Sequence, residues 1–219
     1  MVILYRFDNN SAIIESYSFE DLTQLENYND VEYINCRTNL TVIPELPSGL
    51  KYLNCTGNQL TVLPELPPGL KTLHCSQNQL TVLPVLPTGL EILGCSNNNL
   101  TVLPELSESL TALYCTGNKL TSLPELPTSL KILECSYNSI IMIPVLPDML
   151  SYIWYTNNPI YRYIKKYCNG DIELYHKINK IFANKIETWF LKCKYNPEYK
   201  YCRDRVNAEY DNLLGTYLF

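Results

Sequence analysis

A block of 20 residues recurs without insertion or deletion through the middle of this chain. The first copy reads TVIPELPSGLKYLNCTGNQL and the second reads TVLPELPPGLKTLHCSQNQL. Full copies begin at Thr41, Thr61, Thr81, Thr101 and Thr121, and a weaker copy runs from Ile141 to Ile160. A fixed period of this length means that each copy is one structural unit stacked on the next. The repeat therefore predicts a solenoid.

Each block divides into a strand half and a return half. In the strand half, Leu53 and Cys55 alternate with polar residues, which predicts a short strand with these two side chains facing inward. An asparagine such as Asn58 follows in every copy and is expected to hydrogen-bond to backbone groups of neighbouring coils. The return half carries prolines such as Pro64 and Pro67, which forbid a helix and favour an extended, polyproline-like path.

Residues 31–40 are expected to form a first coil that is slightly out of step. Ile34 and Cys36 keep the spacing of the inward pair in the later copies. The turn after Cys36 is one residue shorter than the turn after Cys55. We therefore expect Asn39 to take the amide role in this coil.

The pattern LxxLxCxxNxLTxLPxLPxxL resembles the leucine-rich repeat, in the short class found in bacterial effector proteins. The resemblance covers residues 31–160. Cysteine stands where those effectors carry Val or Leu on the strand, and in this respect the repeats are most like those of large or giant DNA viruses. The resemblance implies a leucine-rich-repeat solenoid, with a parallel β-sheet on its concave face and an extended, polyproline-like convex side.

Both ends of the chain depart from the repeat, so three parts are expected. Residues 1–30 are predicted to form a β-rich N-terminal cap, with a hairpin around Asp8–Ser11 and a short helix that begins at Ser18. Residues 31–160 are the leucine-rich repeats. Residues 161–219 are predicted to form an α-helical C-terminal cap, because their apolar residues recur at helical spacing. There, Asn169-Gly170 is expected to end one helix and Asp171 to begin the next.

Bulk composition limits the classes of partner and the compartment. A net charge of −5 is too small to indicate nucleic-acid binding. The absence of an 18-residue apolar run and of a signal-peptide pattern leads us to expect no membrane partner and no secretion. The 9 cysteines fit free thiols in a reducing compartment, because most of them occupy one repeat position. The expected location is cytoplasmic, and the host cytoplasm if the protein is viral.

No cofactor, metal site or catalytic residue is predicted. The repeat cysteines would lie in one row facing a leucine core, without the tetrahedral grouping that zinc needs. Cys202 and Asp204 match the Cys-x-Asp motif of effector ubiquitin ligases that share this repeat class, in which the cysteine accepts ubiquitin. Only 17 residues follow Cys202, and no histidine is among them, so a packed helix is the favoured interpretation. A relative of those ligases stays an alternative, and the chain is not expected to be an enzyme.

The outward strand positions vary while the inward ones repeat. Several are aromatic or apolar, and such residues are enriched at interfaces. The residues predicted to bind a partner on the concave face are Tyr33, Asn35, Tyr52, Asn54, Thr72, His74, Ile92, Tyr114, Ile132, Glu134, Tyr152 and Trp154.

The favoured function is a non-catalytic scaffold for protein–protein interaction, with a host protein as one candidate partner. A structural or self-assembling component of a homo-oligomer or virion is the alternative. The sequence leaves open the oligomeric state of the chain. It also leaves open whether the C-terminal helices cover Tyr152 and Trp154.

Overall fold

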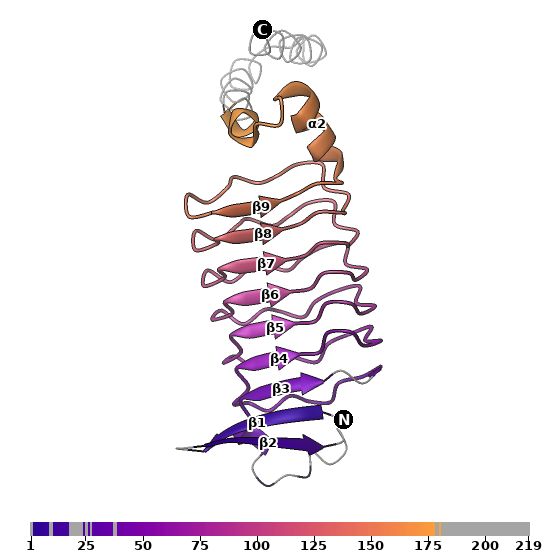
Figure 1. Ribbon diagram of the computed structural model, residues 1–219, viewed down its shortest axis with the longest axis vertical. Coiled ribbons are helices and arrows are strands. Elements are labelled where there is room, and N and C mark those ends of the chain that lie inside the picture. The colour runs from indigo at the N-terminus through magenta and orange to yellow at the C-terminus, as the bar shows by residue number, and fades with distance from the viewer. Residues whose placement is uncertain are drawn as a thin grey trace, which may run out of the picture. The chain divides into compact units, whose positions relative to one another are not determined.

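The computed structural model describes residues 2–8, 11–17, 24, 26, 28–36, 39–177 and 180. The chain divides into two units, residues 1–159 and 160–219. In the described part, a hairpin, one 3-10 helix and a stack of short strands precede a helix (Figure 1). The bounds are β1 Val2–Asp8, β2 Ser11–Tyr17, η1 Tyr28–Asp30, β3 Tyr33–Cys36, β4 Tyr52–Asn54, β5 Thr72–His74, β6 Ile92–Gly94, β7 Ala112–Tyr114, β8 Ile132–Glu134, β9 Tyr152–Trp154 and α2 Pro159–Tyr167.

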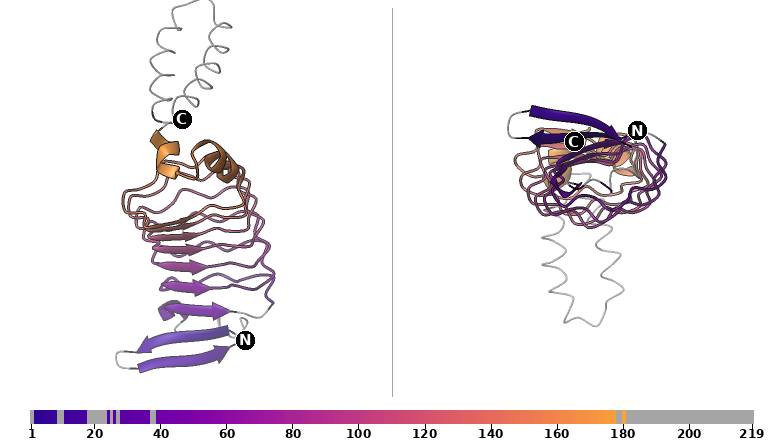
Figure 2. Two further views of the ribbon diagram at one scale, coloured as in Figure 1. Left: turned by 45° about the horizontal axis from the view of Figure 1, so that its top comes forward. Right: turned by 90° about the horizontal axis from the view of Figure 1, so that it is seen from below.

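Strands β3 to β9 form a parallel sheet in chain order, so each coil adds one strand beside the last. The register advances by one repeat per strand, and Leu53 lies opposite Leu73, which lies opposite Leu93. The return half of each coil runs back on the side away from the strands, with neither helix nor strand between residues 41 and 51 or in the matching later segments (Figure 2). This arrangement confirms the predicted solenoid.

The inward side chains form a continuous apolar core. Leu50, Leu53, Cys55 and Leu60 are fully buried, and the same positions are fully buried in each coil through Ile140. Complete burial of one such leucine side chain contributes roughly 1.5–3 kcal/mol. Repetition of this set therefore supplies the main driving force that stacks one coil on the next.

A ladder of buried asparagines joins each coil to its neighbour. The Asn98 amide nitrogen donates to the carbonyl of Cys95 at 3.1 Å and to that of Cys75, one coil earlier, at 3.0 Å. The Leu80 N–H in turn donates to Asn98 Oδ1 at 3.0 Å. The same three bonds occur at the other ladder positions, except that Tyr155 takes the place of the own-coil cysteine as acceptor at the last one. These positions are Asn58, Asn78, Asn118, Asn138 and Asn158. The predicted asparagine ladder is confirmed.

The residue before each ladder asparagine has a left-handed backbone. Glycine takes this position in two coils, with φ of 74° at Gly57 and 70° at Gly117. The other coils place Gln77, Asn97, Tyr137 and Asn157 there, with φ between 53° and 56°. Glycine adopts this region at no steric cost, whereas most other side chains do so with strain.

The expectation for Asn39 is wrong. Asn39 is exposed and has φ of 54°, which places it at the left-handed turn position and not at the buried ladder position. Because this turn lacks one residue, position 39 must adopt the left-handed backbone that closes the turn, and its side chain does not reach the buried ladder position. Asparagine tolerates that backbone. As in the later coils, the Leu40 N–H donates to Oδ1 of the next coil's ladder asparagine, Asn58, at 2.9 Å.

The hairpin at the N-terminal end of the sheet matches the sequence prediction. Strand β1 pairs with β2 in antiparallel fashion, and Asp8 lies opposite Ser11. Strand β1 also pairs antiparallel with β3, so it occupies the edge of the parallel sheet. An open edge of this kind otherwise presents unpaired backbone groups to other chains. The helix expected from Ser18 falls mainly on residues 18–23, which lie outside the described part.

The 3-10 helix η1 packs against the first return segment. The Tyr28 hydroxyl donates to the Glu45 carbonyl at 2.6 Å, and the Gly49 N–H donates to the Asn29 carbonyl at 3.0 Å. A β-carbon at Gly49 would lie 2.4 Å from that carbonyl oxygen, so this close approach requires glycine.

Helix α2, which begins at Pro159, ends as predicted. Asn169 and Gly170 both have a left-handed backbone, and the Gly170 N–H donates to the Ile164 carbonyl at 3.1 Å. Asp171 Oδ1 accepts a hydrogen bond from the Leu174 N–H at 2.9 Å, which is the geometry of a helix N-cap. Residues 172–177 are helical. The predicted last helix, with Cys202, lies outside the described part.

Candidate functional site

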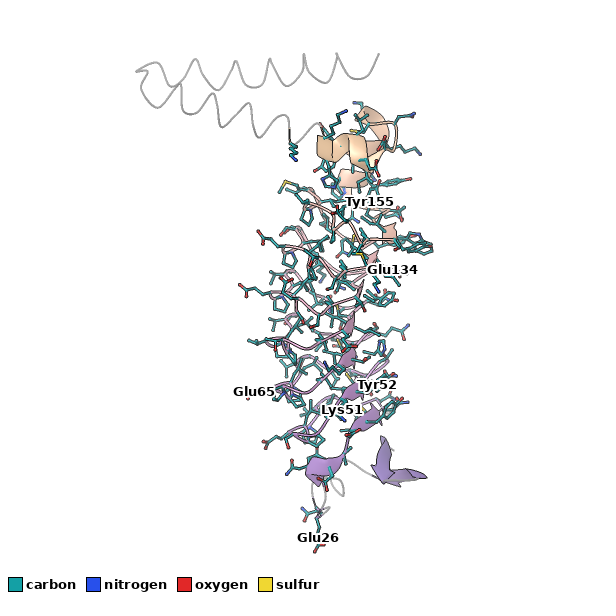
Figure 3. The ribbon with its side chains drawn as sticks, turned by 90° about the vertical axis from the view of Figure 1, so that its left-hand side faces the viewer. Glu26, Lys51, Tyr52, Glu65, Glu134 and Tyr155 are labelled. Atoms are coloured by element: carbon teal, nitrogen blue, oxygen red, sulfur yellow. The ribbon has the colours of Figure 1, made fainter. Side chains whose placement is uncertain are left out.

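The predicted binding residues lie at the first and third positions of strands β3–β9, on either side of a middle residue that faces the core. We call this surface the outer sheet face. Figure 3 shows Tyr52 and Glu134 on the strand side of the repeats, away from Glu65 on the return side. Of the predicted residues, ten are partly buried, namely Tyr33, Asn35, Tyr52, Asn54, Thr72, His74, Ile92, Tyr114, Ile132 and Glu134. Tyr152 and Trp154 are exposed.

Strand register arranges these side chains in two rows across the sheet. The first row consists of Tyr33, Tyr52, Thr72, Ile92, Ala112, Ile132 and Tyr152. The second row consists of Asn35, Asn54, His74, Gly94, Tyr114, Glu134 and Trp154. Paired positions on neighbouring parallel strands are about 4.8 Å apart, so side chains within one row are neighbours. The structure thus brings together all the residues that the sequence analysis selected.

At the N-terminal end of the outer sheet face the aromatic rings contact one another. The rings of Tyr33 and Tyr52 stack with centroids 4.2 Å apart and planes 4° from parallel. The His74 ring lies 5.7 Å from that of Tyr52, at a tilt of 60°. Asn54 Oδ1 accepts a hydrogen bond from the Thr56 N–H at 3.1 Å. The rings of Tyr33, Tyr52 and His74 are therefore in contact with one another within the molecule.

Small residues occupy the middle of the outer sheet face. Gly94 and Ala112 are both buried, although they occupy outward positions. A β-carbon at Gly94 would lie 2.7 Å from His74 Nδ1, so the imidazole fills the space that a side chain would need. Burial lowers the pKa of His74, which keeps its ring neutral at pH 7. The contact between His74 and Gly94 was not predicted; the glycine at an outward strand position beside a histidine was its sequence signal.

The C-terminal end of the outer sheet face carries exposed aromatic rings and one carboxylate. Tyr152 is 46% exposed and Trp154 is 53% exposed, and their ring centroids lie 5.5 Å apart. Glu134 lies between Tyr114 and Trp154 in the second row. Among the described residues, ion pairs join Lys51 to Glu32 and Lys71 to Glu91, and none joins a cation to Glu134.

The inward cysteines form a buried row whose thiols stay protonated at neutral pH. Burial raises the pKa of the Cys95 thiol from 9.0 to about 12, and it raises the thiol pKa values of the neighbouring coils in the same direction. Cys36, Cys55, Cys75, Cys95, Cys115, Cys135 and Cys168 are free thiols. Within the described ranges no group of three or more His, Cys, Asp or Glu residues is placed to hold a metal ion.

An exposed apolar stripe on the return half was missed by the sequence analysis. It consists of Val42, Val62, Val82, Val102 and Met142, which are between 52% and 66% exposed. The signal was available, because each of these residues precedes an inward leucine or isoleucine, and adjacent residues of an extended chain point to opposite sides.

Among the helices of the described residues, none has the length and apolar character of a membrane span.

Neither a protein-family model nor a curated protein matches the chain. Solved structures of bacterial effector proteins resemble it. The leucine-rich-repeat domain of a Shigella effector is 39% identical, with a TM-score of 0.56, over 59% of this chain and 60% of that one. YopM from Yersinia enterocolitica is 35% identical, with a TM-score of 0.52, over 59% of this chain and 34% of that one. The chain thus matches less than two thirds of the length of either effector structure. Its fold is a leucine-rich-repeat solenoid of the type found in these bacterial effectors.

Proposed function

We propose that the chain is a non-catalytic scaffold that binds a protein partner through the outer sheet face, the surface expected to be concave. The observation that carries this proposal is the exposure of Tyr152 and Trp154, which place aromatic surface on an open sheet. Aromatic residues of this kind dominate binding energy at protein interfaces. We further propose a large DNA virus as the source of the chain, because cysteine occupies one strand position of the repeats, and therefore a host cytoplasmic protein as the candidate partner.

A photo-cross-linking experiment tests this proposal. A photoreactive phenylalanine analogue is introduced at Tyr114 or Trp154 on the outer sheet face, or at Val85 on the return side as a control. Val85 is 87% exposed, so it is open to any partner that binds elsewhere. After irradiation in host lysate, we expect the same discrete cross-linked protein from positions 114 and 154 and not from position 85. The purified partner should then bind the wild-type chain and lose at least tenfold in affinity for the double variant Tyr114→Ala/Trp154→Ala, about 1.4 kcal/mol. Equal affinity for both chains would refute binding through this face.

Self-association is the second candidate, because the exposed Val/Met stripe is long and repeats in most coils. Contiguous apolar surface on a soluble protein commonly marks an interface. Light scattering after size exclusion tests this candidate. A dimer or larger assembly that becomes monomeric in the triple variant Val62→Lys/Val82→Lys/Val102→Lys would support it, and a monomeric wild type would exclude it.

We also propose that residues 1–30 and 161–219 act as caps for the repeats of residues 31–160. A stack of open coils exposes an apolar layer at each end, and terminal capping units supply solubility. Deletion of residues 161–219 should therefore lower the melting temperature and cause aggregation. An unchanged melting temperature would show that the repeats do not need this segment.

A further inference from the structure

Three outward side chains at the C-terminal end of the sheet form one continuous row. Tyr114 lies opposite Glu134 on the neighbouring strand, and Glu134 lies opposite Trp154 on the next. Neighbouring parallel strands are about 4.8 Å apart, so the carboxylate has an aromatic residue on each side at nearest-neighbour distance. Glu134 points to the strand side of the repeats, as Figure 3 shows.

Glu134 differs from the other acidic residues beside the strands. Glu32 and Glu91 form ion pairs with Lys51 and Lys71. Glu134 is partly buried and has no ion-pair partner among the described residues. Lys131, at the start of the same segment, is exposed and forms no ion pair with it. A partly desolvated carboxylate without a counter-charge favours the arrival of a cation.

The two aromatic neighbours of Glu134 favour a guanidinium group over an ammonium group as the bound cation. A cation over the face of Trp or Tyr is attracted by the ring quadrupole, and the guanidinium group of arginine stacks on such rings more readily than an ammonium group. Guanidinium also matches a carboxylate through two parallel hydrogen bonds. An arginine side chain that lies on Glu134 can therefore use the carboxylate and one or both rings together.

We propose that Tyr114, Glu134 and Trp154 form a receptor site for an arginine side chain of the protein partner. This inference rests on the proposed function and adds the chemistry of one contact. The N-terminal end of the outer sheet face provides no equivalent site, since the Tyr52 ring is already stacked on Tyr33 and a neutral histidine stands in the second row. The partner segment is thus expected to place its arginine over β7–β9 and not over β3–β5.

The test uses the full chain and three short peptides of the form acetyl-Gly-Gly-X-Gly-Gly-amide. X is arginine, its neutral isostere citrulline, or lysine. The readout is the NMR signal of the Trp154 indole N–H, which the variant Trp154→Phe identifies against Trp189. We expect a saturable shift with the arginine peptide, and at least about tenfold weaker binding of the citrulline peptide because it lacks the charge. The lysine peptide should bind about threefold more weakly than arginine, because its ammonium group stacks less well.

A matched pair of variants assigns the effect to Glu134. Glu134→Gln keeps the shape and removes the charge, and it should weaken binding of the arginine peptide about tenfold. Glu105→Gln removes an exposed carboxylate from the return side and should leave binding unchanged. The proposal is overturned if the arginine peptide causes no shift, or if citrulline binds as well as arginine. Equal binding by Glu134→Gln and wild type would overturn it as well, and equal binding of lysine would overturn the assignment to guanidinium.

The failure of this inference can be told apart from failure of the proposed function. If the cross-linked partner binds Glu134→Gln as tightly as wild type but loses affinity for Tyr114→Ala/Trp154→Ala, the outer sheet face is the binding surface and the arginine site is wrong. If neither variant changes its affinity, both proposals fall. A loss with both variants supports both.

Discussion

The inner and outer sides of the same short strands differ in how their side chains find partners. On the inner side, Leu53, Cys55 and Asn58 have equivalents at the same positions one coil away, and every ladder asparagine donates to a carbonyl of its own coil and to one of the preceding coil. On the outer side most positions have an unlike neighbour, apart from the pairs Tyr33–Tyr52 and Asn35–Asn54. The outer side also differs between its two ends, because Tyr33 and Tyr52 stack on each other whereas Tyr152 and Trp154 are exposed. On the inner side, the repeated residues are buried against one another. On the outer side, the unlike residues at the C-terminal end leave the Tyr152 and Trp154 side chains exposed to a partner.

The largest expected effect comes from a substitution in the ladder of buried asparagines. Asn98→Ala removes four hydrogen bonds, the longest of them to the Ser96 carbonyl at 3.4 Å, and leaves the buried Leu80 N–H without its acceptor. The Cys75 and Cys95 carbonyls keep the amides of Asn78 and Asn118. We expect a loss of about 3 kcal/mol in the free energy of unfolding. Urea denaturation followed by circular dichroism measures it. The neighbouring Asn99→Ala should change stability by less than about 0.5 kcal/mol, and a similar loss for both would contradict the role of the ladder.

The next effect compares two glycines at one repeat position. A β-carbon at Gly117 would lie 2.4 Å from Asn97 Oδ1, whereas the nearest atom to a β-carbon at Gly57 is Gln77 Oε1 at 3.9 Å. Both glycines have a left-handed backbone. We expect Gly117→Ala to cost about 2 kcal/mol and Gly57→Ala about 1 kcal/mol, because only the first adds a collision to the backbone strain. Thermal unfolding of both variants would show whether the neighbouring coil constrains this turn.

Titration of the buried thiols gives a pH-dependent effect that is smaller over any one pH unit. The pKa of Cys95 rises from 9.0 in the unfolded chain to about 12 in the folded chain, because burial disfavours the thiolate. Above pH 9.0 the unfolded state releases this proton and the folded state keeps it, so stability falls as the pH rises toward 12. In this window, Cys95→Ala should reduce the pH slope of the unfolding free energy by about 1.4 kcal/mol per pH unit. Ser96→Ala is the control, and an unchanged slope in Cys95→Ala would show that the thiol is not shielded in the fold.

The smallest expected effect sharpens the contrast between the two ends of the outer sheet face. Tyr52→Leu breaks a stacked ring pair and should cost about 1 kcal/mol of stability. Trp154→Leu removes an exposed ring and should cost less than about 0.5 kcal/mol. Partner affinity should respond in the opposite order, with the greater loss at Trp154. A larger stability loss at Trp154 than at Tyr52 would mean that this end, too, is used within the molecule.

The repeated positions made the fold predictable from sequence. The spacing of Leu53, Cys55 and Asn58 is enough to predict strand, core and ladder, because each residue meets its own copy one coil away. The shorter turn at Asn39 misled the same reasoning, since a missing residue changed which requirement the asparagine meets. Asn39 meets the need for a left-handed backbone and not the need for a buried amide. Sequence spacing alone does not show which of these two requirements decides the position.

The candidate site could be predicted only as a set of positions. Strand alternation placed Tyr114, Glu134 and Trp154 on one surface, and cross-strand register could be derived from the repeat. Whether each of these side chains is buried or exposed could not be predicted, because it depends on how rotamers pack between unlike neighbours. The His74 ring fills the place beside Gly94 and the Tyr33 ring covers Tyr52, whereas no neighbouring ring covers Trp154 to the same degree.

The ladder asparagines reach back by one coil and no further, as Asn98 does to Cys75. Each coil is therefore bonded through its ladder only to its immediate neighbours, and a coil inserted between Asn78 and Asn98 would find the same partners on both sides. Such a change would move Tyr52 and Trp154 apart by one strand spacing, about 4.8 Å, without altering the chemistry of either end. Duplication or loss of one repeat during evolution can thus change the separation between the two aromatic ends in steps of one strand spacing.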